Sequence, residues 1–127
     1  MRIRTLLNRC HYHKSFVYEK EQVEVIHGQV ALVVDVVPRK NGKAICSGCG
    51  GSARGYDKSR QARLFSFVPI WGHAVYLRYV MRRVQCVSCG VKVEQVPWAE
   101  GKSPRTRVYE VFLARWARRL SWTEVAG

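Results

Sequence analysis

The amino-acid sequence predicts a small α+β protein, in which a zinc-ribbon antiparallel sheet is followed by a C-terminal helix that begins an incomplete helix-turn-helix. Two observations lead to this prediction. Two Cys-x-x-Cys pairs, Cys46/Cys49 and Cys86/Cys89, stand among β-branched segments, and the apolar spacing becomes helical after residue 103. Because 47% of the 127 residues are hydrophobic, the chain has enough apolar side chains to bury one core.

Valine-rich and aromatic segments mark the expected strands. Gln29 to Val37 predicts a buried strand, and Leu64 to Val68 with Val75 to Val84 predict the two arms of an antiparallel hairpin around PIWGHA. A further short strand is expected from Val91 to Val96, directly after the second cysteine pair. The polar and basic stretch from Arg54 to Arg63 is interpreted as a loop.

The C-terminal region has the period of an amphipathic helix. Large apolar residues recur every four positions from Val108 to Leu120, and Ser103 or Thr106 is the expected N-cap. We expect this helix to end near Leu120, because SWTE at residues 121–124 has the form of a capping box that starts another helix. A helix, a break and a new helix start are how a helix-turn-helix begins, and the sequence is interpreted as truncated inside that element.

These elements divide the chain into three expected regions. Residues 1–27 form an N-terminal segment without a clean period, residues 28–102 a zinc-ribbon domain, and residues 103–127 the truncated start of a helix-turn-helix. No apolar run approaches the roughly 20 residues needed to cross a bilayer. The N-terminus also lacks the apolar stretch of a secretory signal, so an intracellular protein without a membrane partner is expected.

The spacing of four of the five cysteines is that of a metal site. In an intracellular chain, a Cys-x-x-Cys knuckle directs two thiolates at one ion, and two knuckles complete a closed tetrahedral site for one structural Zn²⁺. Gly48, Gly50 and Gly90 permit the tight backbone of each knuckle. The 36 residues between Cys49 and Cys86 exceed a usual ribbon insert, and the predicted hairpin accounts for most of them.

Other uses of the four cysteines compete with zinc binding. A redox dithiol would open a helix in a βαβ pattern, which neither pair does. An iron–sulfur cluster also takes four cysteines and stays open as an alternative. Cys10, His11 and His13 form a weaker candidate cluster, which we interpret as a free thiol beside two ordinary surface histidines.

Positive charge is concentrated in the segment that contains the cysteine pairs. The net charge is +13, and residues 39–107 alone carry fourteen basic and three acidic side chains. A localised field of this kind attracts a polyanion, and the phosphate backbone of DNA is the expected partner. The alternative is a solvated basic surface, or a zinc-ribbon module that docks on a protein or on RNA. The predicted DNA contacts are Arg78, Arg82, Arg83, Lys92, Lys102, Arg105 and Arg107.

Several blocks of this sequence resemble the N-terminal region of ISL-three-type insertion-sequence transposases. They are KSFVYEK (14–20), CSGCG (46–50), GYD (55–57), FVPIWG (67–72), MRRVQC (81–86), CGVKVEQVPWAEGK (89–102) and FLARWARRLSWTEVA (112–126). The resemblance implies that Cys46, Cys49, Cys86 and Cys89 are the zinc ligands. It also implies that this region and a following helix-turn-helix bind the terminal inverted repeats of the element, in a bacterial cytoplasm at the nucleoid.

We expect this chain to lack the catalytic domain of that family. Strand transfer in the family needs an acidic triad in a ribonuclease-H-like domain, whereas Asp35 and Asp57 are the only aspartates here. We therefore expect a DNA-binding region of a truncated transposase that takes no part in catalysis on its own. Any homo-oligomer is expected to form through the missing C-terminal regions.

Overall fold

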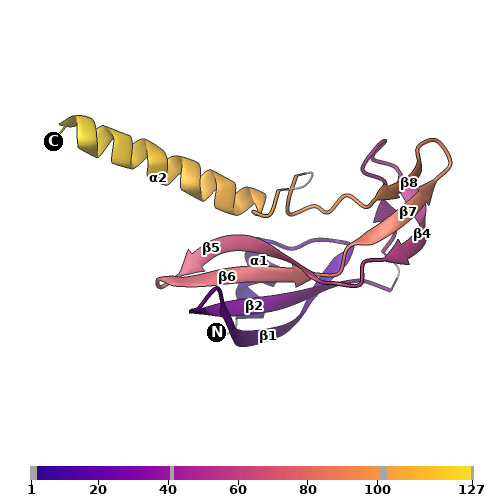
Figure 1. The fold of residues 1–127 in the computed structure, drawn as a ribbon, viewed down its shortest axis with the longest axis horizontal. Helices are drawn as coiled ribbons and strands as arrows, with labels where there is room; N and C mark the ends of the chain where they lie inside the picture. The colour runs from indigo at the N-terminus through magenta and orange to yellow at the C-terminus, as the bar shows by residue number, and fades with distance from the viewer. Residues whose placement is uncertain (1–2, 41, 101–102, 127) are drawn as a thin grey trace.

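The computed structural model describes residues 3–40, 42–100 and 103–126, with only the backbone described for residue 3 and for residues 119–126. Within these ranges the chain forms two four-stranded sheets and two helices (Figure 1). The fold is therefore small and mostly β, with a cysteine cluster at the far end of one sheet.

The first sheet is built from two hairpins. β1 (Phe16–Ile26) pairs with β2 (Gln29–Pro38), and β5 (Arg63–Ile70) pairs with β6 (His73–Tyr79), both antiparallel. Each hairpin turns through two residues with positive φ, His27-Gly28 and Trp71-Gly72, as the twist of paired strands favours. The hairpins join through a parallel pairing of β2 with β6, which gives the order β1-β2-β6-β5.

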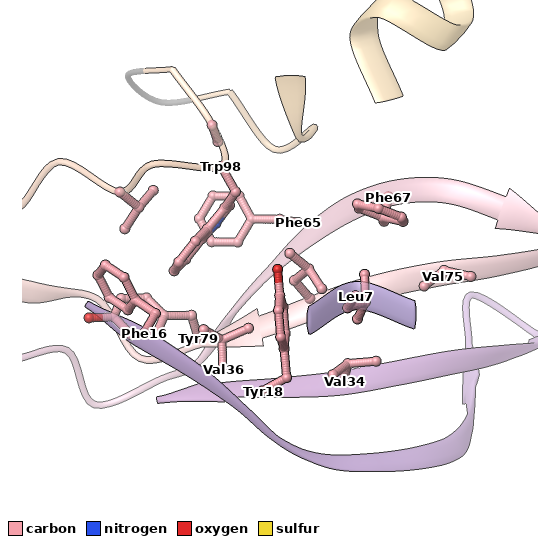
Figure 2. Packing of buried hydrophobic residues seen from close by; sticks show 13 residues of the cluster. Leu7, Phe16, Tyr18, Val34, Val36, Phe65, Phe67, Val75, Tyr79 and Trp98 are labelled. Carbon is pink, nitrogen blue, oxygen red and sulfur yellow. The ribbon is translucent and has the colours of Figure 1, made fainter. Parts of the chain in front are cut away.

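One face of this sheet carries the main core. Leu7 of α1 (Ile3–Cys10) packs onto it, and Trp98 covers its other end from a segment far along the chain (Figure 2). The Trp98 ring makes edge-on contacts with Phe16, Phe65 and Tyr79 at centroid distances of 5.0, 5.7 and 5.2 Å. Such edge-to-face pairs stabilise beyond the area they bury, so Trp98 anchors the chain after the second sheet back onto the first.

The second sheet is antiparallel and contains the cysteine knuckles. Its strands are β3 (Ala44–Ile45), β4 (Ser52–Lys58), β7 (Arg82–Cys86) and β8 (Gly90–Val93), in the order β3-β4-β7-β8. Its buried core consists of Ala44, Cys46 and Val84. Three small side chains bury too little apolar area to hold a sheet, so this sheet needs other stabilisation.

A buried carboxylate links the two sheets. Glu94, which is 3% exposed, follows β8 and accepts a hydrogen bond from the Tyr79 hydroxyl at the end of β6. It also accepts bonds from the Arg82 backbone N–H at 3.0 Å and from Arg82 Nη2 at 2.8 Å. Burial, and then the bond to Glu94, raise the pKa of Tyr79, so the phenol stays protonated as the donor.

The last helix, α2 (Arg107–Ala126), begins at Thr106. The Thr106 hydroxyl accepts a hydrogen bond from the Tyr109 N–H at 3.2 Å and donates one to the Ser66 carbonyl at 3.0 Å. Thr106 is thus the N-cap, one of the two predicted candidates, and it fastens the helix start to the edge of β5. The helix starts beside β5 and then runs away from the second sheet, toward and past the β5–β6 turn of the first sheet (Figure 1).

The expected break at Leu120 and Ser121 is wrong. α2 continues as one helix to Ala126, and no helix-turn-helix is present among the described residues. The reason is that neither glycine nor proline occurs between residues 107 and 126, so nothing interrupts the backbone hydrogen bonds. Within a helix, Ser121 costs a few tenths of a kcal/mol at most, which neighbouring turns offset.

The observed strands agree in part with those expected from the sequence. The strand from Gln29 and the hairpin around Trp71 are confirmed, and the strand after the second knuckle is present as β8. The predicted arm from Val75 to Val84 is wrong in extent, because it divides at Val80 into β6 and β7 in different sheets. The loop expected from Arg54 is wrong as well: β4 pairs there with β7.

Neither helix within the described ranges is long and apolar enough to span a lipid bilayer.

Replacing Glu94 with Gln should destabilise the fold by about 2–3 kcal/mol, because Arg82 would keep its charge in a partly buried site without a carboxylate. Urea unfolding of the metal-loaded protein measures this as a lower midpoint at unchanged slope. Asp57→Asn is the matched control, since its partner Arg83 lies on the surface, and it should leave the midpoint nearly unchanged. Equal midpoints for the two variants would refute the structural role of Glu94.

Candidate metal centre and basic groove

Two similar turns carry the cysteine pairs. Cys46 follows β3, and its carbonyl accepts a hydrogen bond from the Gly50 N–H at 2.9 Å. Cys86 ends β7, and Gly90 begins β8. Gly50 and Gly90 each directly follow the second cysteine of a pair, and both have positive φ, at 75° and 80°. Only glycine adopts this conformation without strain, which explains the shared Cys-x-x-Cys-Gly form of the two knuckles.

The two knuckles bring four sulfur atoms together. The Sγ atoms of Cys46, Cys49, Cys86 and Cys89 all lie within 4.8 Å of one another, and those of Cys49 and Cys86 are 3.6 Å apart. Tetrahedral zinc with Zn–S bonds of about 2.3 Å places its sulfur ligands about 3.8 Å apart. The donor set and its spacing therefore fit a zinc ion bound by four thiolates.

The surroundings of the sulfurs also suit thiolate ligands. The Gly48 N–H donates to Cys46 Sγ at 3.3 Å, and Cys46 is fully buried. Hydrogen bonds from the backbone of Cys89 and then of Ser88 lower the pKa of Cys86 to about 7. Burial, and then hydrogen bonds with the other three thiols, raise the pKa of Cys89 to about 12. Four thiols this close cannot all ionise unless a cation compensates their charge.

Residues 42–89 match the family model described as the zinc-finger of transposase IS204/IS1001/IS1096/IS1165. This segment is a transposase zinc ribbon of the ISL-three type. No curated protein and no solved structure matches the chain. The match includes all four clustered cysteines, so the zinc ribbon binds one structural Zn²⁺.

The zinc ion would cross-link the two cysteine knuckles of the zinc ribbon. With four cysteines around it, the site leaves no position open for a water molecule or a substrate, which is the arrangement of structural zinc. The ion would join the β3 end of the ribbon to the turn between β7 and β8, across a core of only three buried residues. Metal binding and folding of the zinc ribbon are therefore expected to be coupled.

A groove of about 1140 Å³ runs beside the zinc ribbon, between its strands and the segment that leads to α2. Basic residues dominate its charged lining. They are Lys58, Arg60, Arg63, Arg82, Arg83, Lys92 and Arg107, against the acidic Asp57, Glu94 and Glu100. Positive charge therefore gathers around a concave surface, and the concave shape concentrates the electrostatic field inside the groove.

The seven predicted DNA contacts divide between this groove and other places. Arg82, Arg83, Lys92 and Arg107 line it. Arg78, which lies on the first sheet, and Arg105, an exposed residue just before α2, do not. Lys102 falls outside the described residues.

Ion pairs engage some of these basic residues and leave others unpaired. Arg78 contacts Asp35 at 2.7 Å and Glu24 at 2.8 Å, Arg82 contacts Glu94 at 2.8 Å, and Arg83 pairs with Asp57. Across the described part of the chain, Lys58, Arg60 and Lys92 form no ion pair, and all three are exposed. Lys58 and Arg60 are not among the DNA contacts predicted from the sequence, although both belong to the basic run from Arg54 to Arg63, which could have indicated them.

The N-terminal cysteine and histidines do not form a metal site. The His11 ring contacts Phe67 edge-on at 5.2 Å, and the His13 ring lies 5.8 Å from that of Trp98. Burial lowers the pKa of both histidines, as expected for rings packed at the edge of a core. Cys10 is an exposed free thiol. Among the described residues, the four ribbon cysteines are the one group arranged for a metal ion.

Cys46→Ser or Cys89→Ser should abolish zinc binding and with it cooperative unfolding of the zinc ribbon. Purified protein is expected to contain about one zinc per chain by elemental analysis, and a chelator should unfold the ribbon. Cys10→Ser is the matched control and should change neither property, because Cys10 lies on α1, outside the cluster. A folded, reduced sample without metal would overturn the assignment.

Gly48→Ala should weaken zinc binding by about 10- to 100-fold, as other changes next to metal ligands do. A Cβ at Gly48 would lie 3.0 Å from Cys89 Sγ, so the ligand would have to move. Gly55→Ala provides the comparison, because a Cβ there meets nothing within 4 Å. Competition with a chromogenic chelator measures both affinities, and equal values would show that the knuckle tolerates the extra methyl group.

Proposed function

We propose that this chain is the zinc-dependent DNA-binding region of a transposase of the ISL-three type and that it binds the terminal inverted repeats of the element. The observation that carries the proposal is the basic groove beside the zinc ribbon. Its exposed Lys58, Arg60 and Lys92 are not neutralised by carboxylates within the described residues. Unpaired cations of this kind release counterions from DNA when they contact phosphates.

The distribution of ion pairs indicates which residues contact DNA. Arg78 and Arg82 would have to leave their carboxylate partners to reach a phosphate, so we assign them structural roles. Lys58, Arg60 and Lys92 need no such exchange. Arg83, Arg105 and Arg107 are exposed and keep their proposed role at the rim, since a surface ion pair opens at little cost.

We further propose that the chain has no strand-transfer activity of its own. Each of its two aspartates is paired with an arginine, Asp35 with Arg78 and Asp57 with Arg83. Among the described residues, no group of three acidic side chains is arranged to hold metal ions, as a two-metal active site requires. Recognition of the repeats would then serve a reaction performed by other parts of a transposase.

Lys58→Gln combined with Lys92→Gln should weaken binding to duplex DNA and flatten the salt dependence. Each lost phosphate contact removes roughly 0.9 from the slope of log affinity against log salt, so the slope should fall by about two units. Fluorescence anisotropy over a series of salt concentrations measures both quantities. The duplexes are the terminal repeat that flanks the gene and a scrambled sequence of equal composition.

Lys14→Gln combined with Lys20→Gln removes the same charge from exposed sites away from the groove, and should change the slope far less. Equal effects of the two double variants would mean that DNA responds to overall charge and that the groove is not the binding site. Equal affinity for the repeat and the scrambled duplex would overturn the proposed specificity. Salt-insensitive binding to a protein would instead favour an interaction module.

A further inference from the structure

One face of the second sheet is exposed to solvent. Its opposite face carries the small ribbon core, to which Val84 of β7 belongs. Because side chains alternate between the two faces of a strand, Arg83 and Gln85 project from the exposed face. Both residues are exposed, as are Val91 and Val93 on the neighbouring strand β8. These strands stand at one end of the molecule, and α2 runs toward the other end, so the helix does not cover them (Figure 1).

Strand pairing arranges this face in two rows that each cross three strands. Residues directly opposite each other in an antiparallel sheet project from the same face, and β7 pairs with β4 on one side and with β8 on the other. We call this surface the ribbon face. The first row is Arg54, Gln85 and Val91, and the second row is Asp57, Arg83 and Val93.

The polar side chains of the first row are free to bind a partner. In the second row, the Arg83 guanidinium is already bonded to Asp57. Across the ranges that the structure describes, the side chains of Arg54 and Gln85 make no ion pair and no hydrogen bond. They stand beside Val91, which is 42% exposed. The first row therefore presents a guanidinium, a carboxamide and an apolar side chain to whatever lies against the sheet.

We propose that the ribbon face enters the major groove of duplex DNA and that Arg54 and Gln85 contact base edges there. This inference rests on the DNA binding proposed above and adds the residues that select the sequence. Arginine forms two hydrogen bonds with guanine O6 and N7, glutamine forms two with adenine N6 and N7, and apolar side chains contact the thymine methyl group. The first row thus combines three kinds of side chain that distinguish bases in the major groove.

Size and charge select the major groove as the partner of this face. Three strands spaced about 4.8 Å apart are about 10 Å across, whereas the major groove is about 12 Å wide and the minor groove about 6 Å. The ribbon face also adjoins the basic groove, since Arg83 and Val93 belong to both. Phosphates bound by Lys58 and Lys92 would therefore hold the duplex beside the first row, and base contacts would add specificity to that position.

The geometry also limits the length of the sequence that is recognised. Arg54 and Gln85 lie directly opposite each other, so their Cβ atoms are about 5 Å apart. This distance is between one and two base-pair steps of about 3.4 Å. The two side chains should therefore contact neighbouring base pairs, within a short motif that contains guanine and adenine.

Selection from a library of random duplexes, with the zinc-loaded full chain, tests the proposal. The wild-type chain should enrich such a motif. Arg54→Ala and Gln85→Ala should each lower the preference at one position of the motif by about fivefold or more, with far less effect on affinity for a scrambled duplex. Arg9→Ala on α1 and Gln29→Ala on β2 are the matched controls, at exposed sites outside the second sheet, and should leave the motif unchanged.

Modified purines then show which groove is contacted. A 7-deaza analogue of a selected guanine or adenine lacks only the N7 acceptor, which lies in the major groove. The wild-type chain should lose affinity for that duplex, whereas the variant without the side chain that contacts this purine should lose little more, because the two changes remove the same interaction.

The possible failures of this inference and of the proposed function differ. A chain that binds no DNA would overturn both. A chain that binds DNA but enriches no motif would overturn the inference alone, as would variants that weaken binding to every sequence equally. Equal losses of wild type and variants on the 7-deaza duplexes would also overturn it. A motif that is enriched but absent from the terminal repeats would support base contacts by the ribbon face and contradict the proposed target.

Discussion

The carboxylate of Glu94 is shared by both sheets, and the position of the zinc ribbon depends on it. Its oxygens accept hydrogen bonds from Tyr79 at the end of β6 and from Arg82 at the start of β7, while Glu94 itself follows β8. The ribbon has only three buried residues of its own. It is therefore stabilised at both ends, by zinc at the knuckles and by the Glu94 hydrogen-bond network at the junction with the first sheet. The ribbon core is too small to compensate for the loss of either one.

This arrangement separates the cations that pair within the fold from those proposed to contact DNA. The half-buried arginines Arg78 and Arg82 neutralise carboxylates that are themselves half-buried or buried. The lysines of the groove have no such partner within the described residues, and they stand on β4 and β8, two strands of the sheet that zinc would cross-link. Zinc would therefore support DNA binding indirectly: it would hold β4, β7 and β8 in place, and these strands carry several of the proposed contacts.

The local parts of this architecture could be predicted from the sequence, and the long-range parts could not. The cysteine spacing identified the metal cluster, and valine-rich periodicity located β2 and the hairpin around Trp71. The apolar run Tyr79-Val80-Met81 contains no glycine, proline or other turn signal, so nothing local shows that the chain changes sheets there. The partners of Arg78 and Arg82 lie 43 and 12 residues away, and their pairing exists only in the fold. The division of the chain at residues 28 and 103 and the DNA contacts stay predictions.

Charge links the proposed DNA binding to the stability of the zinc ribbon. The net charge is +13, and the carboxylates near the ribbon are engaged by Arg82, Arg83 and Arg107, so the charge of the exposed Lys58, Arg60 and Lys92 is left uncompensated within the described residues. Like charges gathered around one groove repel each other unless salt or a polyanion compensates. Phosphates bound there would lower this repulsion in the folded state. DNA that binds the folded ribbon more tightly than the unfolded chain would therefore stabilise the fold, by an amount set by its concentration relative to the dissociation constant.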